Sequence, residues 1–173
     1  MCVRCLDLSL HRELAMDATV LSTHDAVIAE IDIAAPPERV FQALTRPEDL
    51  KRWFTNESCP VKFWKMDARP GGRYSYETQP SETVEVNGIN EFKCEGEILE
   101  FDPPRLLVYT WVSNWHLDQS LKTTVRWELT AKGKGTHVKV VHENLASEDT
   151  ARKDYAGGWP GVLNSLRKFS ERS

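Results

Sequence analysis

His142 and Glu143 are adjacent, an arrangement that begins the helix motif of zinc proteases. The motif also needs a second histidine four residues after the first, and Ala146 stands at that position. A lone histidine can still exchange protons, because imidazole titrates near neutral pH. Acid/base chemistry at His142 is therefore one option. The simpler interpretation is a histidine hydrogen-bonded to a neighbouring backbone or carboxylate group.

Cys2 and Cys5 have the spacing of a metal knuckle or a redox pair, but the chain has no second pair. Cys59 and Cys94 lie far apart, and four scattered cysteines do not form the disulfide framework of a small secreted domain. We therefore expect reduced thiols. The chain also lacks a glycine-rich phosphate loop and a serine nucleophile elbow. These observations predict no catalytic residue, no metal site and no cofactor.

Alternating residues in the middle of the chain predict which side chains face the interior of a sheet. In TTVRWEL the apolar positions put Trp127 on the buried face, and in THVKVVHE they turn His142 inward. In GEILEF, Leu99 shares a face with Phe101 and Glu97, so we also predict an inward carboxylate at Glu97.

The segment LLVYTWV is apolar on both faces, and we predict that Tyr109 and Trp111 face the interior. Such residues either fill a core or line a small-molecule cavity, which is usually apolar and aromatic with a few polar groups. Six tryptophans in 173 residues favour a cavity slightly. The predicted lining is Trp53, Tyr74, Tyr76, Glu97, Leu99, Tyr109, Trp111, Trp127, His142, Trp159, Leu163 and Leu166.

The elements that must position these residues begin with AVIAEIDIAA, whose period of two predicts a first strand. Pro36 and Pro37 then favour a helix start, and Thr45 is placed to cap a second short helix. The residues before Asp25 show neither pattern. We expect residues 1–24 to be a peripheral or poorly ordered extension, with Met16 a possible start, and residues 25–173 to form one domain.

The middle of the chain alternates strand-like runs with turns such as Asn87-Gly88 and Gly133-Lys134-Gly135. Such short connections favour antiparallel neighbours. Helical spacing from Trp159 to Phe169 predicts a long terminal helix, opened by Trp159 and Pro160 after a polar connection from Leu145 to Asp154. The predicted strands are Val61 to Met66, Gly72 to Glu77, Thr83 to Val86, Phe92 to Phe101, Leu106 to Val112, Thr123 to Leu129 and Thr136 to His142.

This order of elements predicts an α+β fold, in which a curved antiparallel sheet wraps around the last helix. Several segments in order resemble the activator of heat-shock protein 90 ATPase homologue family: IDIAAPPERVFQALTRPEDLKRWF, MDARPGGRYSYE, GEILEFDPPRLLVYTW, GTHVKVVHENL and GGWPGVLNSL. The resemblance runs from about Val27 to Phe169. It implies a helix-grip fold of the START and birch-pollen-allergen (SRPBCC) superfamily, which contains lipid carriers, hormone receptors, aromatase/cyclases and chaperone regulators.

The composition of the chain excludes two classes of partner. The net charge of -4 leaves no basic surplus for nucleic acid, and no apolar stretch reaches the ~20 residues of a membrane span. We expect a cytoplasmic monomer or homodimer that binds a small apolar or amphipathic molecule without catalysis. One alternative is a chaperone-interacting regulator with an exposed recognition surface. The other is an aromatase/cyclase-like enzyme that uses His142.

Overall fold

The protein, described by a computed structural model for residues 18–55, 57–118 and 120–172, is built on one eight-stranded antiparallel sheet. The strand order is β1-β2-β8-β7-β6-β5-β4-β3, so β1 and β3 form the two edges. The strands are β1 (Thr19–Ser22), β2 (Val27–Ile33), β3 (Val61–Met66), β4 (Arg73–Thr78), β5 (Lys93–Asp102), β6 (Leu106–Ser113), β7 (Thr123–Lys132) and β8 (Gly135–Glu143).

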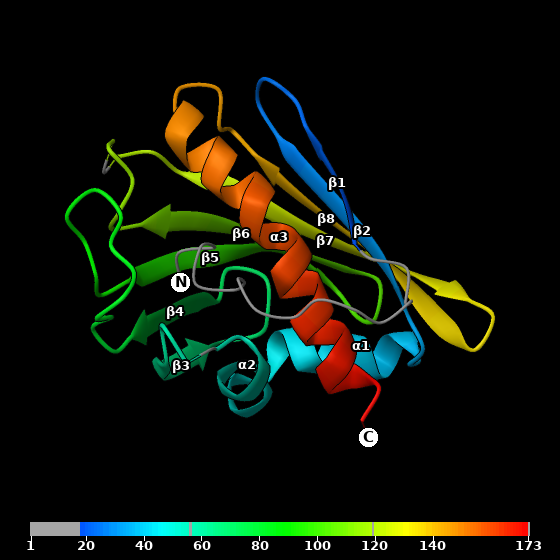
Figure 1. The fold of residues 1–173 in the computed structure, drawn as a ribbon. Coiled ribbons are helices and arrows are strands. Elements are labelled where there is room, and N and C mark those ends of the chain that lie inside the picture. Colours follow the sequence, from blue (N-terminus) through cyan, green and yellow to red (C-terminus); the bar gives the residue numbers. More distant parts are fainter. Residues whose placement is uncertain (1–17, 56, 119, 173) are drawn as a thin grey trace.

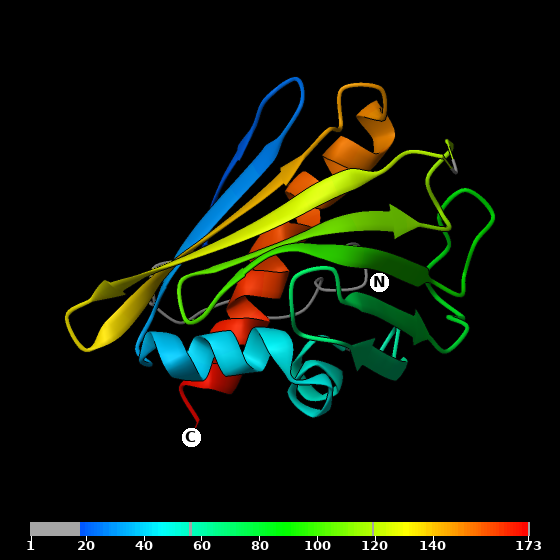
Figure 2. The ribbon, with the colours of Figure 1, turned by 180° about the vertical axis from the view of Figure 1, so that it is seen from behind.

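Three helices accompany the sheet within the described residues: α1 (Pro37–Thr45), α2 (Pro47–Trp53) and α3 (Asp149–Ser170). In Figure 1, α3 crosses one face of the curved sheet, and α1 and α2 lie at one end, beside the C-terminal half of α3. Figure 2 shows the strands in front of α3 when the molecule is seen from behind. The α+β helix-grip prediction is therefore confirmed.

Alternation along the strands decides which residues form the core. In β2 every second residue from Val27 to Ile33 is buried, and the pattern continues in β7 and β8. Strand side chains alternate between the two faces of a sheet, so these residues share one buried face. That face is the one on which α3 packs. The backbone of α3 comes nearest to β1 and β2. Large buried side chains of β4, β6 and β7 fill the space between the helix and the other strands.

Two predictions of local structure are wrong. Thr83 to Val86 is not a strand, because within it only Val86 makes an isolated bridge, to Ile89. Thr45 does not cap α2: its hydroxyl donates to the carbonyl of Phe41 one turn back, and Arg46 takes the N-cap position without a side-chain hydrogen bond.

The terminal helix begins earlier than predicted. It starts at Asp149 and carries Pro160 in its interior, although an interior proline removes one backbone hydrogen bond. Burial of Ala151 and Tyr155 against the sheet explains why the helix extends through this position, since tertiary packing overrides local propensity. The sheet likewise begins before Asp25, because β1 pairs with β2. Met16 lies outside the described residues.

Candidate functional site

The aromatic layer between the sheet and α3 is the most distinctive part of the interior. Trp111 lies at its centre, with ring centroids 5.8 Å from Tyr76 and 5.9 Å from His142. Phe54, which follows α2, contacts Tyr76 with ring centroids 5.6 Å apart and joins the layer to the short helices. The layer consists of Trp64, Tyr74, Tyr76, Tyr109, Trp111, Trp115, Trp127, His142, Tyr155 and Trp159.

Tyr155 of α3 anchors the helix to the sheet. Its hydroxyl accepts a hydrogen bond from Nε1 of Trp111 at 2.9 Å and lies 2.7 Å from Nε2 of His116. All three side chains are buried. Burial lowers the pKa of His116, against the opposing charges of Glu148 and Asp118. The network therefore ties the connection between β6 and β7 to α3.

His142 of β8 is fully buried, and its hydrogen bonds fix its tautomer. Thr123 Oγ1 lies 2.7 Å from Nε2 of His142 and 3.0 Å from the carbonyl oxygen of Trp111. The Thr123 hydroxyl has one proton and gives it to the carbonyl, so Nε2 must be the donor to Oγ1. Burial holds the pKa of His142 well below its ordinary value. The imidazole is therefore neutral, with its lone pair on Nδ1.

Other polar groups of the layer have partners within the protein. Nε1 of Trp127 donates to the hydroxyl of Tyr109 at 2.9 Å. The Tyr74 hydroxyl donates to the carbonyl oxygen of Thr110 at 2.9 Å and lies 3.6 Å from Sγ of Cys94. Burial raises the pKa of Cys94 to about 12 and that of Tyr109 well above its ordinary value. The polar side-chain groups of Trp127, Tyr109 and Tyr74 therefore have hydrogen-bond partners within the protein, as is usual in a core.

Five buried polar atoms of the layer have no hydrogen-bond partner among the residues that the structure describes. Native proteins leave few buried polar atoms unpaired, because each costs roughly 1–3 kcal/mol. Several such atoms therefore make the layer a candidate site. They are Nε1 of Trp64, the hydroxyl of Tyr76, Nε1 of Trp115, Nδ1 of His142 and Nε1 of Trp159.

Most of the predicted lining residues lie in the interior as expected. Trp53 is buried at the end of α2, where its Nε1 donates to the carbonyl of Ala43 at 2.8 Å, and its ring packs on Phe54. The leucines of α3 are fully buried beneath the layer. The inward residues are Trp53, Tyr74, Tyr76, Tyr109, Trp111, Trp127, His142, Trp159, Leu163 and Leu166.

The predicted inward orientation is wrong for Glu97 and Leu99. Glu97 is exposed and Leu99 is 47% exposed, while Ile98 points into the core. A β-bulge between Ile98 and Glu100 explains the error, because an extra residue reverses the alternation. Phe101 follows the bulge and contacts Phe41. The orientation of Phe101 therefore does not predict the orientation of Leu99, which precedes Glu100.

Sequence reasoning missed Trp64, Trp115, His116, Thr123 and Tyr155. Tyr155 stands four residues before Trp159, so the helical stripe could have revealed it if the helix had been extended across Gly157 and Gly158. The loop residues Trp115 and His116 carried no periodic signal.

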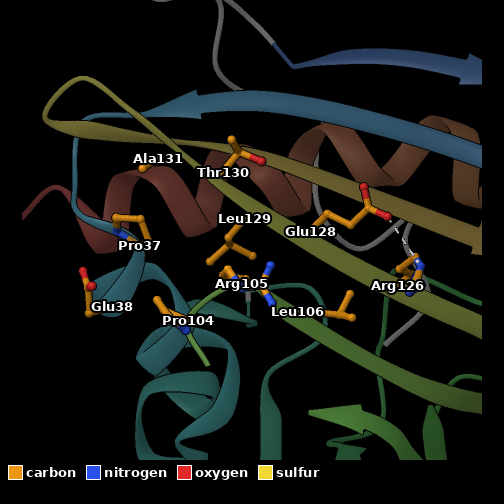
Figure 3. Close-up of a pocket in the computed structure, with 10 residues that line it drawn as sticks. All are labelled: Pro37, Glu38, Pro104, Arg105, Leu106, Arg126, Glu128, Leu129, Thr130 and Ala131. Atoms are coloured by element: carbon orange, nitrogen blue, oxygen red, sulfur yellow. Dashed lines mark ion pairs between the residues drawn. The ribbon is translucent and has the colours of Figure 1, made fainter. Parts of the chain in front are cut away.

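A surface pocket of about 580 Å³ lies between the start of α1, the turn after β5 and strand β7 (Figure 3). Three of its charged side chains form ion pairs: Arg126 lies 3.5 Å from Glu128 and 3.2 Å from Glu100, and Arg105 pairs with Asp102. Within the described residues, none of the buried polar atoms without a partner belongs to a residue that lines this pocket. The aromatic layer is therefore the stronger candidate site.

Cys59 is disulfide-bonded and Cys94 is a buried free thiol. This disulfide contradicts the expectation that the thiols are reduced. Stable disulfides are typical of oxidising compartments. Cys2 and Cys5 lie outside the described residues. Within the described ranges, no three His, Cys, Asp or Glu side chains are grouped as metal ligands. None of the helices in that part of the chain is long and apolar enough to cross a membrane.

Solved structures share this architecture. Protein CV1439 from Chromobacterium violaceum superposes with a TM-score of 0.71 at 25% identity, covering 86% of this chain and 99% of that one. NE0264 from Nitrosomonas europaea gives 0.70 at 22% identity, with 86% and 96% covered. CalU16 from Micromonospora echinospora gives 0.63 at 22% identity, with 90% and 86% covered.

A search of curated proteins found no match. The family model described as "Activator of Hsp90 ATPase homolog 1-like protein" matches residues 34–171, which include α1, α2, α3 and every strand from β3 to β8. That match extends over most of the chain and agrees with the observed fold. The chain belongs to the Activator of Hsp90 ATPase homolog 1-like family.

Proposed function

We propose that the protein binds a small, largely apolar molecule with hydrogen-bonding groups in the aromatic layer between α3 and the sheet. The observation that carries the proposal is the set of unpartnered buried atoms on Trp64, Tyr76, Trp115, His142 and Trp159. A ligand that buried its apolar body among these rings would meet the polar atoms with its own polar groups. Small-molecule sites usually combine an apolar lining with a few such groups.

The ring distances describe a narrow site. His142 and Tyr155 have centroids 4.1 Å apart, and Trp127 and Trp159 have centroids 5.5 Å apart. These rings are in contact, so a bound molecule must separate α3 from the strands to lie between them. Flat, unsaturated molecules suit such a layer, because aromatic pairs add roughly 0.5–1.5 kcal/mol beyond the burial of their area.

Binding fits the electrostatics of the layer better than acid/base catalysis does. Burial lowers the pKa of His142, which makes its imidazole a weak base at neutral pH. Its Nδ1 lone pair can accept a hydrogen bond but gains little from taking a proton. The Tyr155 hydroxyl already contacts Trp111 and His116. Neither side chain is therefore poised to move a proton on a substrate.

Native mass spectrometry of the protein as purified tests the proposal. We expect a non-covalent adduct below about 1 kDa, or a 1:1 complex after addition of 1-naphthol, that disappears on denaturation. Leu99→Ala is the matched control, because this side chain lies on the opposite face and its loss should leave binding unchanged. Absence of both the adduct and the complex at millimolar 1-naphthol would contradict the proposal.

A second candidate function is regulation of a chaperone, which the description of the family favours. This role needs an exposed recognition surface and a cytoplasmic location, and both are proposals for this chain. Stimulation of a purified heat-shock protein 90 ATPase would support it, and an unchanged ATPase rate at saturating protein would exclude it. The oxidation state of Cys59 in protein extracted from cells would test the location.

A further inference from the structure

The C-terminal ends of α2 and α3 meet at one end of the molecule, beside α1 (Figure 1 and Figure 2). Phe169, in the last turn of α3, lies at this junction. The guanidinium carbon of Arg39 from α1 is 4.6 Å from the centroid of its ring, and that of Arg52 from the last turn of α2 is 5.6 Å away. Cation–π contacts therefore hold guanidinium groups of two helices on one aromatic ring of a third.

Basic side chains outnumber acidic ones at this end, although the chain as a whole is acidic. Residues 37–53 and 167–172 contain seven lysine and arginine residues against four aspartate and glutamate residues. The rest of the chain has 15 of the 22 basic residues and 22 of the 26 acidic ones, so the net charge of -4 combines a positive end with a negative remainder. We call this surface the basic end. Its cations are Arg39, Arg46, Lys51, Arg52, Arg167, Lys168 and Arg172.

Most cations of the basic end have no carboxylate partner. Arg39 pairs with Asp49 at 3.3 Å. Five others are exposed and form no ion pair with the described residues: Arg46, Lys51, Arg52, Lys168 and Arg172.

Attraction to the helix dipole explains only part of this arrangement. Cations favour the last turn of a helix, which accounts for Lys51 and Arg52 in α2 and for Lys168 in α3. That attraction acts within each helix alone. It does not explain why two helices bring their cations together without neutralising them, since like charges at close range repel each other. An anionic partner would relieve this repulsion.

The distribution of the cations suits a partner with several spaced carboxylates. Guanidinium groups bind carboxylates through two parallel hydrogen bonds. Arg39 and Arg52 are already oriented by the ring of Phe169, so they lose less conformational freedom on binding. A small anion needs donors that converge on one point, whereas these cations are spread over three helices. An acidic polypeptide segment can meet them in succession.

Other polyanions fit the basic end less well. Nucleic acid would meet the exposed carboxylates of Glu38, Glu48 and Glu171 at the same end, and the acidic remainder of the chain would repel it. Stable attachment to a membrane surface usually adds inserted apolar side chains to the electrostatic attraction. The exposed large apolar residues of the described chain all lie outside the basic end: Val20, Leu21, Leu99 and Leu117.

We propose that the basic end is a docking surface for an acidic segment of a partner protein, and that Arg52 and Lys168 contact this segment. The inference concerns the outer surface of the three helices. It does not depend on the ligand proposed for the aromatic layer.

Fluorescence anisotropy with a fluorescein-labelled decaglutamate peptide tests the inference. We expect the peptide to bind the wild-type protein at low salt, and added salt to weaken the binding because it screens exposed charges. Arg52→Glu and Lys168→Glu should each weaken binding about fivefold, since each removes an attraction between exposed charges and adds a repulsion. Circular dichroism of each variant checks that it is folded.

Lys122→Glu is the matched control, because it changes the net charge by the same amount at the other end of α3. Lys122 is exposed and lies in the connection between β6 and β7, where the backbone N–H of Asp118 donates to Glu148 at the start of α3. The 22 residues of α3 span about 33 Å. This length is several times the screening length of about 8 Å at physiological salt, so Lys122→Glu should change the affinity by less than about twofold.

Three results would overturn the inference. Equal weakening by Lys122→Glu and Arg52→Glu would mean that binding follows the net charge and not the basic end. Absence of binding by decaglutamate at millimolar concentration and low salt would exclude the docking surface. Tighter binding of single-stranded decathymidylate or of phosphatidylserine vesicles, lost in Arg52→Glu and Lys168→Glu, would assign the basic end to another class of partner. If Arg52→Glu fails to fold, the comparison of Lys168→Glu with Lys122→Glu still decides the question.

Discussion

The hydroxyl oxygen of Tyr155 lies 2.7 Å from Nε2 of His116, where α3 meets the connection between β6 and β7. The same oxygen accepts from Nε1 of Trp111. Tyr155→Phe removes both contacts in a buried region, so we expect the free energy of unfolding to fall by about 2–3 kcal/mol. Urea denaturation followed by tryptophan fluorescence measures this change.

Tyr76→Phe is the control for that measurement. It removes an equally buried hydroxyl that has no partner, and it should change the ligand-free stability by less than about 0.5 kcal/mol or raise it. Similar losses for both variants would show that the contacts of Tyr155 do not distinguish it from any other buried tyrosine.

Acid should destabilise the protein between pH 6.5 and 5. The folded pKa of His142 lies well below its ordinary value of 6.5, so only the unfolded state takes up this proton in that range. The stabilising contribution is complete above pH 6.5 and is lost as the pH falls toward the folded pKa. The slope should approach about 1.4 kcal/mol per pH unit from this group alone. Denaturation curves at half-unit steps of pH give the slope.

His142→Gln should flatten that slope, because it removes the buried imidazole that only the unfolded state protonates in this range. The buried His116, whose pKa burial also lowers, should account for much of the remaining slope. The ordinary pKa values of the shifted carboxyl groups, 3.8 for Asp32, Asp118 and Asp149 and 4.5 for Glu77, lie below the range. Equal slopes for wild type and His142→Gln would refute the neutral buried imidazole.

Gly96 is required by close packing between β4, β5 and β6. A Cβ atom there would lie 1.9 Å from the Thr110 carbonyl oxygen and 2.7 Å from Cε1 of Tyr74. Gly96→Ala should therefore lower the unfolding free energy by about 1–3 kcal/mol or more, as overpacking does. Gly157→Ala, on the exposed side of α3 with nothing near the new methyl group, should raise it by about 0.5–1 kcal/mol. Thermal denaturation of the pair gives the sign, and a neutral Gly96→Ala would refute this packing.

Cys94 should resist alkylation in the native protein. Burial raises the pKa of its thiol to about 12, so the reactive thiolate is scarce at pH 8. Iodoacetamide labelling followed by peptide mass mapping should find the Cys94 peptide unmodified in buffer and modified in 8 M urea. Rapid native labelling would mean that this part of the layer opens.

The fold could be predicted from the sequence because the patterns that indicate its strands and its last helix each extend over several residues. Alternation from Val27 to Ile33 and the helical stripe from Trp159 onward each draw on several residues, so a single error does little harm. The orientations of Trp127 and His142 followed from the same alternation and are correct.

The errors arose where a single local event changes the pattern. The bulge after Ile98 reversed the alternation and misplaced Glu97 and Leu99. Pro160 suggested a helix start, although packing of Tyr155 extends the helix through it. The partners of His116 and Thr123 depend on contacts between distant segments, and no local pattern encodes them.

The indole N–H signals of the six tryptophans in a ¹H–¹⁵N spectrum test the central claim most directly, that the unpartnered polar atoms of the aromatic layer meet a ligand. With the signals assigned by single Trp→Phe variants, saturating 1-naphthol should shift the Trp159 signal strongly. The Trp53 signal should stay in place, because that N–H already donates to Ala43 outside the proposed site. A spectrum in which the Trp159 signal does not move at saturating 1-naphthol would contradict the account.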